Sequence, residues 1–352
     1  MAAVISIEES NPQIIHSIVY KSLQNEVSPE IYEEFIYDND STGSYREQLK
    51  NNYNAVDENI PYYSIKILYV FLAYLFYKMG FSLTISVLIL SLISCFSIFM
   101  ILFHILTKSL NNVYIAGLIT LFIATSSPMM ELAKLTTPDA LSTLSLLIVA
   151  VILINNSKFV YVLIAMVLSI ATRPDNIVFC AVLLIIDFVQ GKKSISQTRP
   201  FFIGLVGVAL TYFVIMQLSN NYGWPILFYN TYIERLSLPK SLTPELKLND
   251  YITVILNRLP ALVNPMLLFT TLIVIYKSNL LTNIRRKILI NSKYVITFFW
   301  TTLITILIRF FLFPNSTNTR FIFVYFLVLI VSVLLAGNWQ INKSHNQIDK
   351  TN

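Results

Sequence analysis

The sequence is poor in charge. Only 12% of its 352 residues are Asp, Glu, Lys or Arg, whereas a typical soluble domain carries about a quarter. So few charged groups cannot cover a water-soluble globule of this length, which excludes a cytoplasmic enzyme, a secreted domain and a disordered tail. The chain has two cysteines, Cys95 and Cys180, both inside apolar runs, so it has neither a disulfide framework nor a cysteine-based metal site.

The signatures of several enzyme classes are also missing. The chain has no Walker loop, no GxSxG elbow and no HExxH pair, and its three histidines, His16, His104 and His345, are scattered. ATP-driven transport and zincin-type hydrolysis therefore have no support. No repeat of fixed period is found either.

What the sequence has is apolar and aromatic side chains, 55% and 13% of its residues. A helix that spans a membrane needs about 20 largely apolar residues. Several stretches approach this length, so we expect an all-α, polytopic membrane bundle of about 8–10 transmembrane helices. The candidate spans are 65–79, 82–106, 113–130, 138–155, 158–190, 200–218, 256–276, 294–313 and 320–337.

One candidate span, 158–190, is too long for a single straight crossing. It is interrupted by Thr172-Arg173-Pro174-Asp175-Asn176. Irregular backbone survives at membrane depth only where protein or water covers it. The segment is therefore either two short helices or one broken helix.

Orientation follows from the Lys and Arg residues of the short loops. Loops 191–200 and 277–293 are basic and contain no acid, which indicates the cytoplasmic side. Loop 219–255 and turn 314–319 then lie outside. Residues 1–64 also lie outside if 158–190 crosses once, and inside if it crosses twice. We expect them outside, because the long polar segments then share one face.

This orientation defines three predicted regions: an acidic extramembrane, periplasmic and partly helical segment 1–64, a transmembrane domain 65–338, and a cytoplasmic tail 339–352. Residues 1–64 hold 11 acidic and 3 basic residues, and the remainder holds 8 and 22. The basic excess lies in short loops, so it does not indicate a nucleic-acid partner. Residues 1–24 contain no apolar run of signal-peptide length. We therefore expect that the chain lacks a first helix or that its first helices insert as a hairpin.

The first candidate site is acidic. Asp38 and Asp40 flank Asn39 and precede Gly43, a pattern typical of a turn. Two carboxylates beside a membrane could act as a general base or bind a divalent cation, a possible cofactor, through oxygen ligands. The alternative is a solvated acidic turn.

The other candidates are charges at the mouths of apolar segments. Lys66 could meet a lipid phosphate or snorkel to the interface. Arg173 and Asp175 could face a cavity and bind substrate there, or pair with each other in a short loop. Arg309 lies about five residues inside a span and Arg320 opens the next, so two guanidiniums could clamp a phosphate. Snorkelling is the alternative for Arg320, whereas Arg309 must face the bundle interior to leave hydrocarbon.

A further polar stretch is explained by helix initiation alone. Thr137 is placed to cap a helix, with Pro138 at its first position and Asp139 favoured by the helix dipole. Glu131 and Lys134 are spaced to pair with each other.

Together, these features resemble the polytopic GT-C-type glycosyltransferases, in particular the bacterial lipid-A aminoarabinose and mannosyl transferases. The resemblance rests on the layout of nearly the whole chain and on Thr137-Pro138-Asp139-Ala140-Leu141, Ala171-Thr172-Arg173-Pro174-Asp175 and an Arg that opens the last span after a Pro/Asn turn. It implies a multi-pass protein of a bacterial inner membrane that transfers a sugar from a polyprenyl-phosphate donor to a lipid, glycan or protein acceptor on the periplasmic face.

The resemblance also implies roles for individual residues. The acid of the first external loop, a base or metal ligand in that family, matches Asp38 or Asp40, with Glu33 and Glu34 as weaker matches. The basic residues that bind the lipid-linked phosphate match Lys66 and Arg320, with Arg309 as a helper. A transporter or flippase, a polymerase for lipid-linked sugars and a non-catalytic membrane assembly subunit stay open as alternatives.

Overall fold

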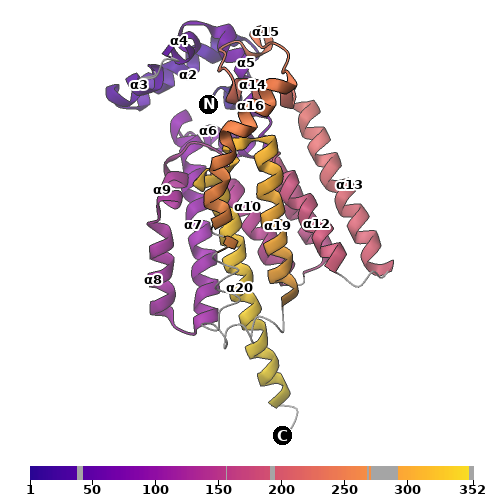
Figure 1. The fold of residues 1–352 in the computed structure, drawn as a ribbon. Helices are drawn as coiled ribbons and strands as arrows, with labels where there is room; N and C mark the ends of the chain where they lie inside the picture. Colours follow the sequence, from indigo (N-terminus) through magenta and orange to yellow (C-terminus); the bar gives the residue numbers. More distant parts are fainter. Residues whose placement is uncertain (38–42, 156, 191–194, 268, 271–291, 349–352) are drawn as a thin grey trace.

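The computed structural model describes residues 1–37, 43–155, 157–190, 195–267, 269–270 and 292–348, and every regular element in these ranges is a helix. The predicted all-α fold class is therefore confirmed. Figure 1 shows long, roughly upright helices, with short helices gathered across one end and the C-terminus at the other.

The acidic N-terminal segment forms short helices that begin at capping residues. The Asn11 side chain accepts a hydrogen bond from the Gln13 amide at 3.0 Å, and Ser28 caps the next helix in the same way. A proline follows each cap, where its fixed φ suits the first helical turn. The helices are α1 (Ala2–Ile5), α2 (Pro12–Glu26), α3 (Pro29–Ile36), α4 (Gly43–Asn51) and α5 (Tyr53–Ser64).

The remainder of the described chain contains the longer apolar helices and a second group of short ones. In order they are α6 (Ile67–Lys78), α7 (Leu83–Leu110), α8 (Val113–Ala124), α9 (Ser127–Lys134), α10 (Asp139–Ile154), α11 (Phe159–Thr172), α12 (Asn176–Gln190), α13 (Ile195–Leu218), α14 (Trp224–Tyr232), α15 (Pro239–Leu242), α16 (Leu248–Arg258), η1 (Leu259–Leu262), α19 (Ser292–Leu312), η3 (Pro314–Thr317) and α20 (Thr319–Ile348).

Some of these helices are long and apolar enough to cross a membrane. In the described chain, three meet both conditions, in α7, α13 and α19. The bent pairs α5–α6 and α8–α9 raise the number to five if each pair counts as one span. Shorter apolar helices are α10, α11, α12 and the part Arg320–Leu335 of α20. The expected number of about 8–10 spans would need these shorter helices as well, and it stays a prediction.

The core lies between α7, α10, α12, α19 and α20. Its side chains include Ile98, Leu146, Phe179 and Tyr325, none more than 1% exposed. Helix α13 packs against α11 and α12 through glycine: a Cβ added at Gly207 would lie 3.1 Å from the Leu163 side chain. A small residue is therefore required where α13 approaches α11.

Two expected spans differ from the structure. Helix α6, in 65–79, has 12 residues, about 18 Å of helix, and is bent by 112° from α5. It is too short for an upright crossing. Segment 158–190 is two helices, α11 and α12, which both pack against α13. Of the two alternatives for this segment, two short helices or one broken helix, the structure has two helices, and the number of crossings that they make stays a prediction.

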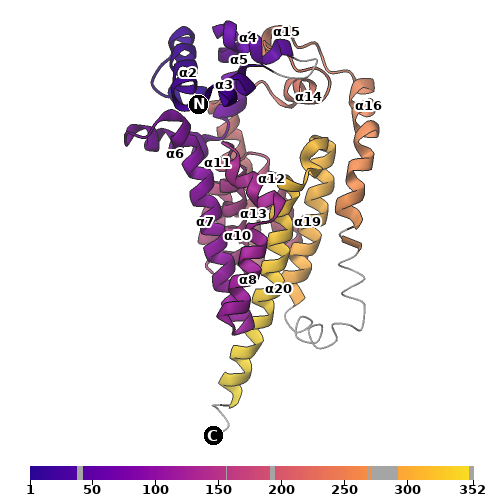
Figure 2. The ribbon, with the colours of Figure 1, turned by 90° about the vertical axis from the view of Figure 1, so that its left-hand side faces the viewer.

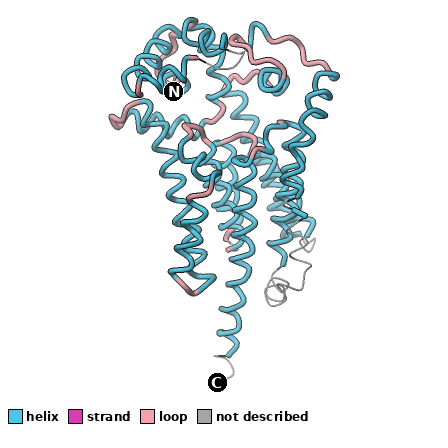
Figure 3. The backbone as a smooth tube through the Cα atoms, turned by 60° about the vertical axis from the view of Figure 1, so that its left-hand side comes forward, coloured by secondary structure: helices cyan, strands magenta, loops and turns pink. Residues whose placement is uncertain are grey.

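The described N-terminal helices, in 1–37 and 43–64, lie at the same end of the bundle as α14 and α15, as Figure 1 shows. Figure 3 shows the C-terminus at the opposite end. Hydrogen bonds join the two segments directly. The Glu58 carboxylate accepts from the Lys240 and Ser241 amides at 2.8 and 3.0 Å, and the Asn59 amide donates to the Ser237 carbonyl at 2.9 Å.

The N-terminal helices are also fixed to the start of the bundle (Figure 2). The Glu8 carboxylate pairs with the Lys78 ammonium at 2.6 Å. The Glu26 carboxylate accepts a hydrogen bond from the Thr84 amide, in the first turn of α7, at 2.9 Å. Val4 and Ile15 are buried together with Leu83 in a small apolar cluster.

Candidate functional site

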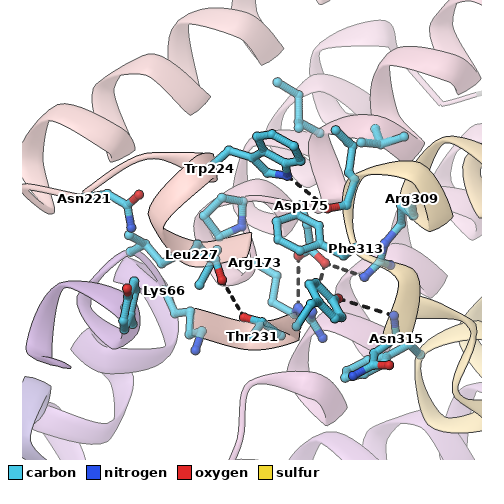
Figure 4. A pocket seen from close by; sticks show the side chains of 18 of the residues that line it. Lys66, Arg173, Asp175, Asn221, Trp224, Leu227, Thr231, Arg309, Phe313 and Asn315 are labelled. Carbon is cyan, nitrogen blue, oxygen red and sulfur yellow. Dashed lines mark hydrogen bonds and ion pairs between the residues drawn. The ribbon is translucent and has the colours of Figure 1, made fainter. Parts of the chain in front are cut away.

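A cavity of about 880 Å³ is lined by residues of α14, of the turn between α11 and α12 and of the segment between α19 and α20, and Figure 4 shows its lining side chains from close by. The charged side chains that line it are Lys66, Arg173, Asp175, Arg309 and Arg320. These are the five residues that the sequence analysis predicted to bind substrate. The structure brings all of them to one cavity, although they come from four separate segments of the chain.

Each charged residue stands at a helix end. Lys66 precedes α6 at the 112° bend, and Arg173 and Asp175 form the turn between α11 and α12. Arg309 lies in the last turn of α19 and Arg320 in the first turn of α20, with η3 between them. Helix ends leave backbone groups unpaired and polar, so charged side chains collect there at the lowest cost.

A network of ion pairs holds two of the arginines. The Arg173 guanidinium donates to both oxygens of Asp175, from Nε at 3.0 Å and from Nη2 at 2.9 Å. Arg309 Nη2 donates to the same carboxylate, and Arg173 Nη1 donates to Asp139. Two guanidiniums and two carboxylates thus balance each other. The pairing expected for Arg173 and Asp175 is present, and both residues also line the cavity.

Arg309 faces the bundle interior and is only 5% exposed. Besides Asp175, it donates a hydrogen bond to the Tyr325 hydroxyl, and the Tyr325 ring stacks on Phe179 with centroids 5.6 Å apart. A charge this deep is tolerated because it is paired and hydrogen-bonded. The network therefore fixes the positions of Arg173 and Arg309 before any ligand binds.

The other two cations are less constrained. Arg320 pairs with Glu131 at 3.3 Å, and its Nε has no hydrogen-bond partner. Lys66 forms no ion pair within the described residues, and its ammonium lies 4.8 Å from the centre of the Tyr63 ring. Lys66 is thus the cation of this cavity that is most available to an anionic ligand.

Sequence analysis missed one member of the network. Asp139 was interpreted as part of a helix start alone, whereas its carboxylate pairs with Arg173, is 7% exposed and accepts a hydrogen bond from Thr137 at 3.0 Å. The helix begins at Asp139, and Pro138 occupies the cap position. One feature of the sequence could have indicated this role: acidic residues are scarce after residue 64, so each one there is a candidate partner for a buried cation.

The pairing expected between Glu131 and Lys134 is not the one observed. Glu131 reaches Arg320, 189 residues further along the chain, and Lys134 is exposed at the end of α9. Position along one helix predicts only local partners, and the partner here is brought in by tertiary packing.

The neutral part of the lining is aromatic, apolar and amide-bearing. The Trp224 indole donates to the Leu312 carbonyl at 2.9 Å, which ties α14 to the end of α19. Burial raises the pKa of Tyr232 to about 12, so its hydroxyl stays protonated at neutral pH. The Tyr62 hydroxyl and the Asn221 side-chain nitrogen are buried without hydrogen-bond partners. They are donors that a ligand could satisfy.

The structure does not test the predicted acidic site. Asp38 and Asp40 lie outside the described residues. Glu33 is exposed on α3 and does not line the cavity. Among the residues that the structure describes, no group of three or more His, Cys, Asp or Glu could hold a metal ion. The divalent cation considered for Asp38 and Asp40 stays a prediction.

Comparison with known proteins adds no relative. The chain matches no protein-family model, no curated protein and no solved structure. The argument for function therefore depends on the residues of the cavity.

Proposed function

We propose that this chain is a polytopic membrane glycosyltransferase of the GT-C type, which takes a sugar from a polyprenyl-phosphate donor at the periplasmic face of a bacterial inner membrane. One observation carries the proposal. Lys66, Arg173, Arg309 and Arg320 line a single cavity at the end of an apolar bundle, and the acid among its described lining residues, Asp175, is already shared by two guanidiniums. Such a cavity favours an anionic ligand.

The chemistry of the transfer suits this arrangement. When the bond between sugar and phosphate breaks, negative charge grows on the phosphate and positive charge on the sugar. Cations that are already in place stabilise the first charge without reorganisation. Arg173 and Arg309 are fixed by their carboxylates, and Lys66 and Arg320 offer donors to the phosphate.

The acceptor side of the reaction is assigned from the resemblance. Asp38 or Asp40 would serve as the base that takes the proton of the acceptor hydroxyl, or would hold a divalent cation beside it. The sugar, released from phosphate, then forms its new bond to the acceptor oxygen.

A transfer assay on the purified full-length protein tests the proposal, with a polyprenyl-phosphate sugar as donor and a lipid fraction as acceptor. We expect Lys66→Met and Arg320→Gln to lower kcat/KM by about 10–100-fold, because each removes a charge-assisted hydrogen bond to the phosphate. Lys134→Met is the matched control, since Lys134 is an exposed lysine outside the cavity. Asp38→Asn and Asp40→Asn should lower kcat. Undiminished transfer in all four cavity and loop variants would overturn the proposal.

A second candidate, a flippase for lipid-linked sugars, is favoured by the buried face of α19. Thr297, Thr301, Thr305 and Arg309 recur every four residues and so share one side of the helix. The threonines are fully buried, and the hydroxyls of Thr301 and Thr305 have no hydrogen-bond partner. Intramembrane polar groups of this kind mark transport pathways in other membrane proteins.

The two candidates are separated by reconstitution in liposomes that contain a fluorescent polyprenyl-phosphate lipid. A flippase would move the lipid between leaflets without any acceptor, and Thr301→Val with Thr305→Val would slow it. A glycosyltransferase would leave the lipid in its leaflet, and the same two substitutions would not change sugar transfer.

A further inference from the structure

A second hollow lies on the outer side of the bundle, between α10 and α11. It has a volume of about 400 Å³, and its walls are almost entirely apolar, with Leu144 and Ile148 on α10 and Ile164, Ala165 and Leu168 on α11. Ile164 and Leu168 are about half exposed, so the hollow opens sideways. We call it the α10–α11 groove.

The groove offers little to a polar ligand. The hydroxyl of Ser145 donates to the Ser142 carbonyl at 2.8 Å, and that of Thr172 donates to the Leu168 carbonyl at 2.8 Å. The hydroxyls of these two lining residues are thus occupied by the backbone of their own helices. A hydrocarbon ligand packed against Ser145 and Thr172 would therefore leave neither hydroxyl without a hydrogen-bond partner.

One end of the groove adjoins the charged cavity. Thr172 lines the groove and Arg173, the next residue, lines the cavity, so their Cα atoms are about 3.8 Å apart. Leu68, in the first turn of α6, lines the groove, and Lys66, which precedes that helix, lines the cavity. Two of the four cations therefore stand where the groove ends.

The length of the groove suits one leaflet of a membrane. Its lining residues on α11 run from Tyr161 to Thr172, which at 1.5 Å per residue is about 16 Å. The hydrocarbon core of a bilayer is about 30 Å thick, so one leaflet is about half of that.

We infer that the α10–α11 groove holds the hydrocarbon chain of an anionic lipid whose phosphate lies at Lys66 and Arg173. This inference deepens the proposed function and rests on it for the position of the phosphate. It adds two features: the lipid enters sideways between α10 and α11, and the apolar surface of the groove selects ligands that carry a hydrocarbon chain.

Photo-crosslinking of the full-length protein tests the inference without disturbing the site. The photoreactive p-benzoylphenylalanine replaces Ile164, which lines the groove and is 50% exposed, or Val160, which lies one turn away on α11, does not line it and is 60% exposed. The probe is a radiolabelled long-chain polyprenyl phosphate in phosphatidylcholine nanodiscs. Parallel samples contain the matching polyprenol or inorganic phosphate as competitor.

We expect labelling at position 164 to exceed that at 160 by about tenfold, the factor that corresponds to roughly two methylenes held in the groove. Excess polyprenyl phosphate should abolish the difference. The polyprenol and inorganic phosphate should not, because each carries only half of the recognised structure. Lys66→Met should reduce labelling at 164 by a similar factor. Ala165→Trp, which fills the groove, should do the same.

The outcomes separate this inference from the proposed function. Equal labelling at 164 and 160, while Lys66→Met still impairs sugar transfer, would overturn the groove and leave the phosphate site intact. Preferential labelling at 164 that polyprenol abolishes and Lys66→Met does not affect would show a neutral lipid in the groove. That result would overturn the inference, whereas the phosphate site of the cavity would fail only if Lys66→Met also left sugar transfer unchanged.

Discussion

The substitution Asp175→Asn tests the ion network most directly. The Asp175 carboxylate accepts two hydrogen bonds from Arg173, at 3.0 and 2.9 Å, and a third from Arg309. The asparagine keeps the shape of the side chain but loses the negative charge. Arg173 would then keep Asp139 as its carboxylate partner, and Arg309 would keep no carboxylate partner among the described residues. Removing one partner from a buried ion pair costs about 3–5 kcal/mol.

This free-energy cost can be measured as a fall in the midpoint of thermal unfolding. Buried, free Cys95 and Cys180 make a thiol-reactive fluorescent dye a suitable probe, because it reports on unfolding as they become accessible. For a loss of about 3 kcal/mol in a chain of 352 residues we expect the midpoint of unfolding in detergent to fall by roughly 4 °C.

The control is the double variant Asp175→Asn with Arg309→Met. It removes one charge of each sign and leaves Arg173 paired with Asp139, so it should recover at least half of the lost stability. If Asp175→Asn leaves the midpoint unchanged, or if the two substitutions simply add, then the network does not neutralise Arg309 and the reasoning fails.

Two further predictions concern the scaffold. Gly207→Leu should lower the unfolding midpoint by several degrees, because even its Cβ would lie 3.1 Å from Leu163, whereas Gly117→Ala, with its nearest neighbour at 3.9 Å, should be neutral in the same dye assay. Burial alone would raise the pKa of Glu26, but hydrogen bonds from Thr84 and Ser82 hold it below its usual value. The stabilisation from a lowered pKa is present above the unfolded pKa and is lost as pH falls through the folded one. Limited proteolysis of residues 1–37 should therefore accelerate at acidic pH, and Glu26→Gln should make cleavage equally fast at neutral pH.

The charged residues of the cavity could be predicted from the sequence because they stand out against apolar surroundings. Arg173, Asp175 and Arg309 each lie within or beside a long apolar run, where a charge needs a partner or a cavity. That these residues meet could not be derived in the same way. Arg309 reaches Asp175 across 134 residues, and nothing local in either segment encodes that contact.

The features that were missed have a common cause. Asp139 has a sufficient local explanation as a helix start, which concealed its pairing with Arg173. The apolar run 65–79 has the composition of a span, but composition does not show the 112° bend before α6. Hydropathy measures what a segment prefers to contact. It does not tell how the helix is oriented or where it ends.

The ion network also bears on the order in which the helices assemble while the chain is being synthesised. Its members lie far apart in sequence, since Asp139 and Arg173 are 34 residues apart and Asp175 and Arg309 are 134 apart. During synthesis, the first pair and the second carboxylate are complete long before α19 leaves the ribosome. In the membrane bundle proposed above, an arginine in an emerging apolar helix is costly to insert, and a carboxylate already present in the bundle reduces that cost. Asp175 would then guide the late helix α19 to its place among helices that have already assembled.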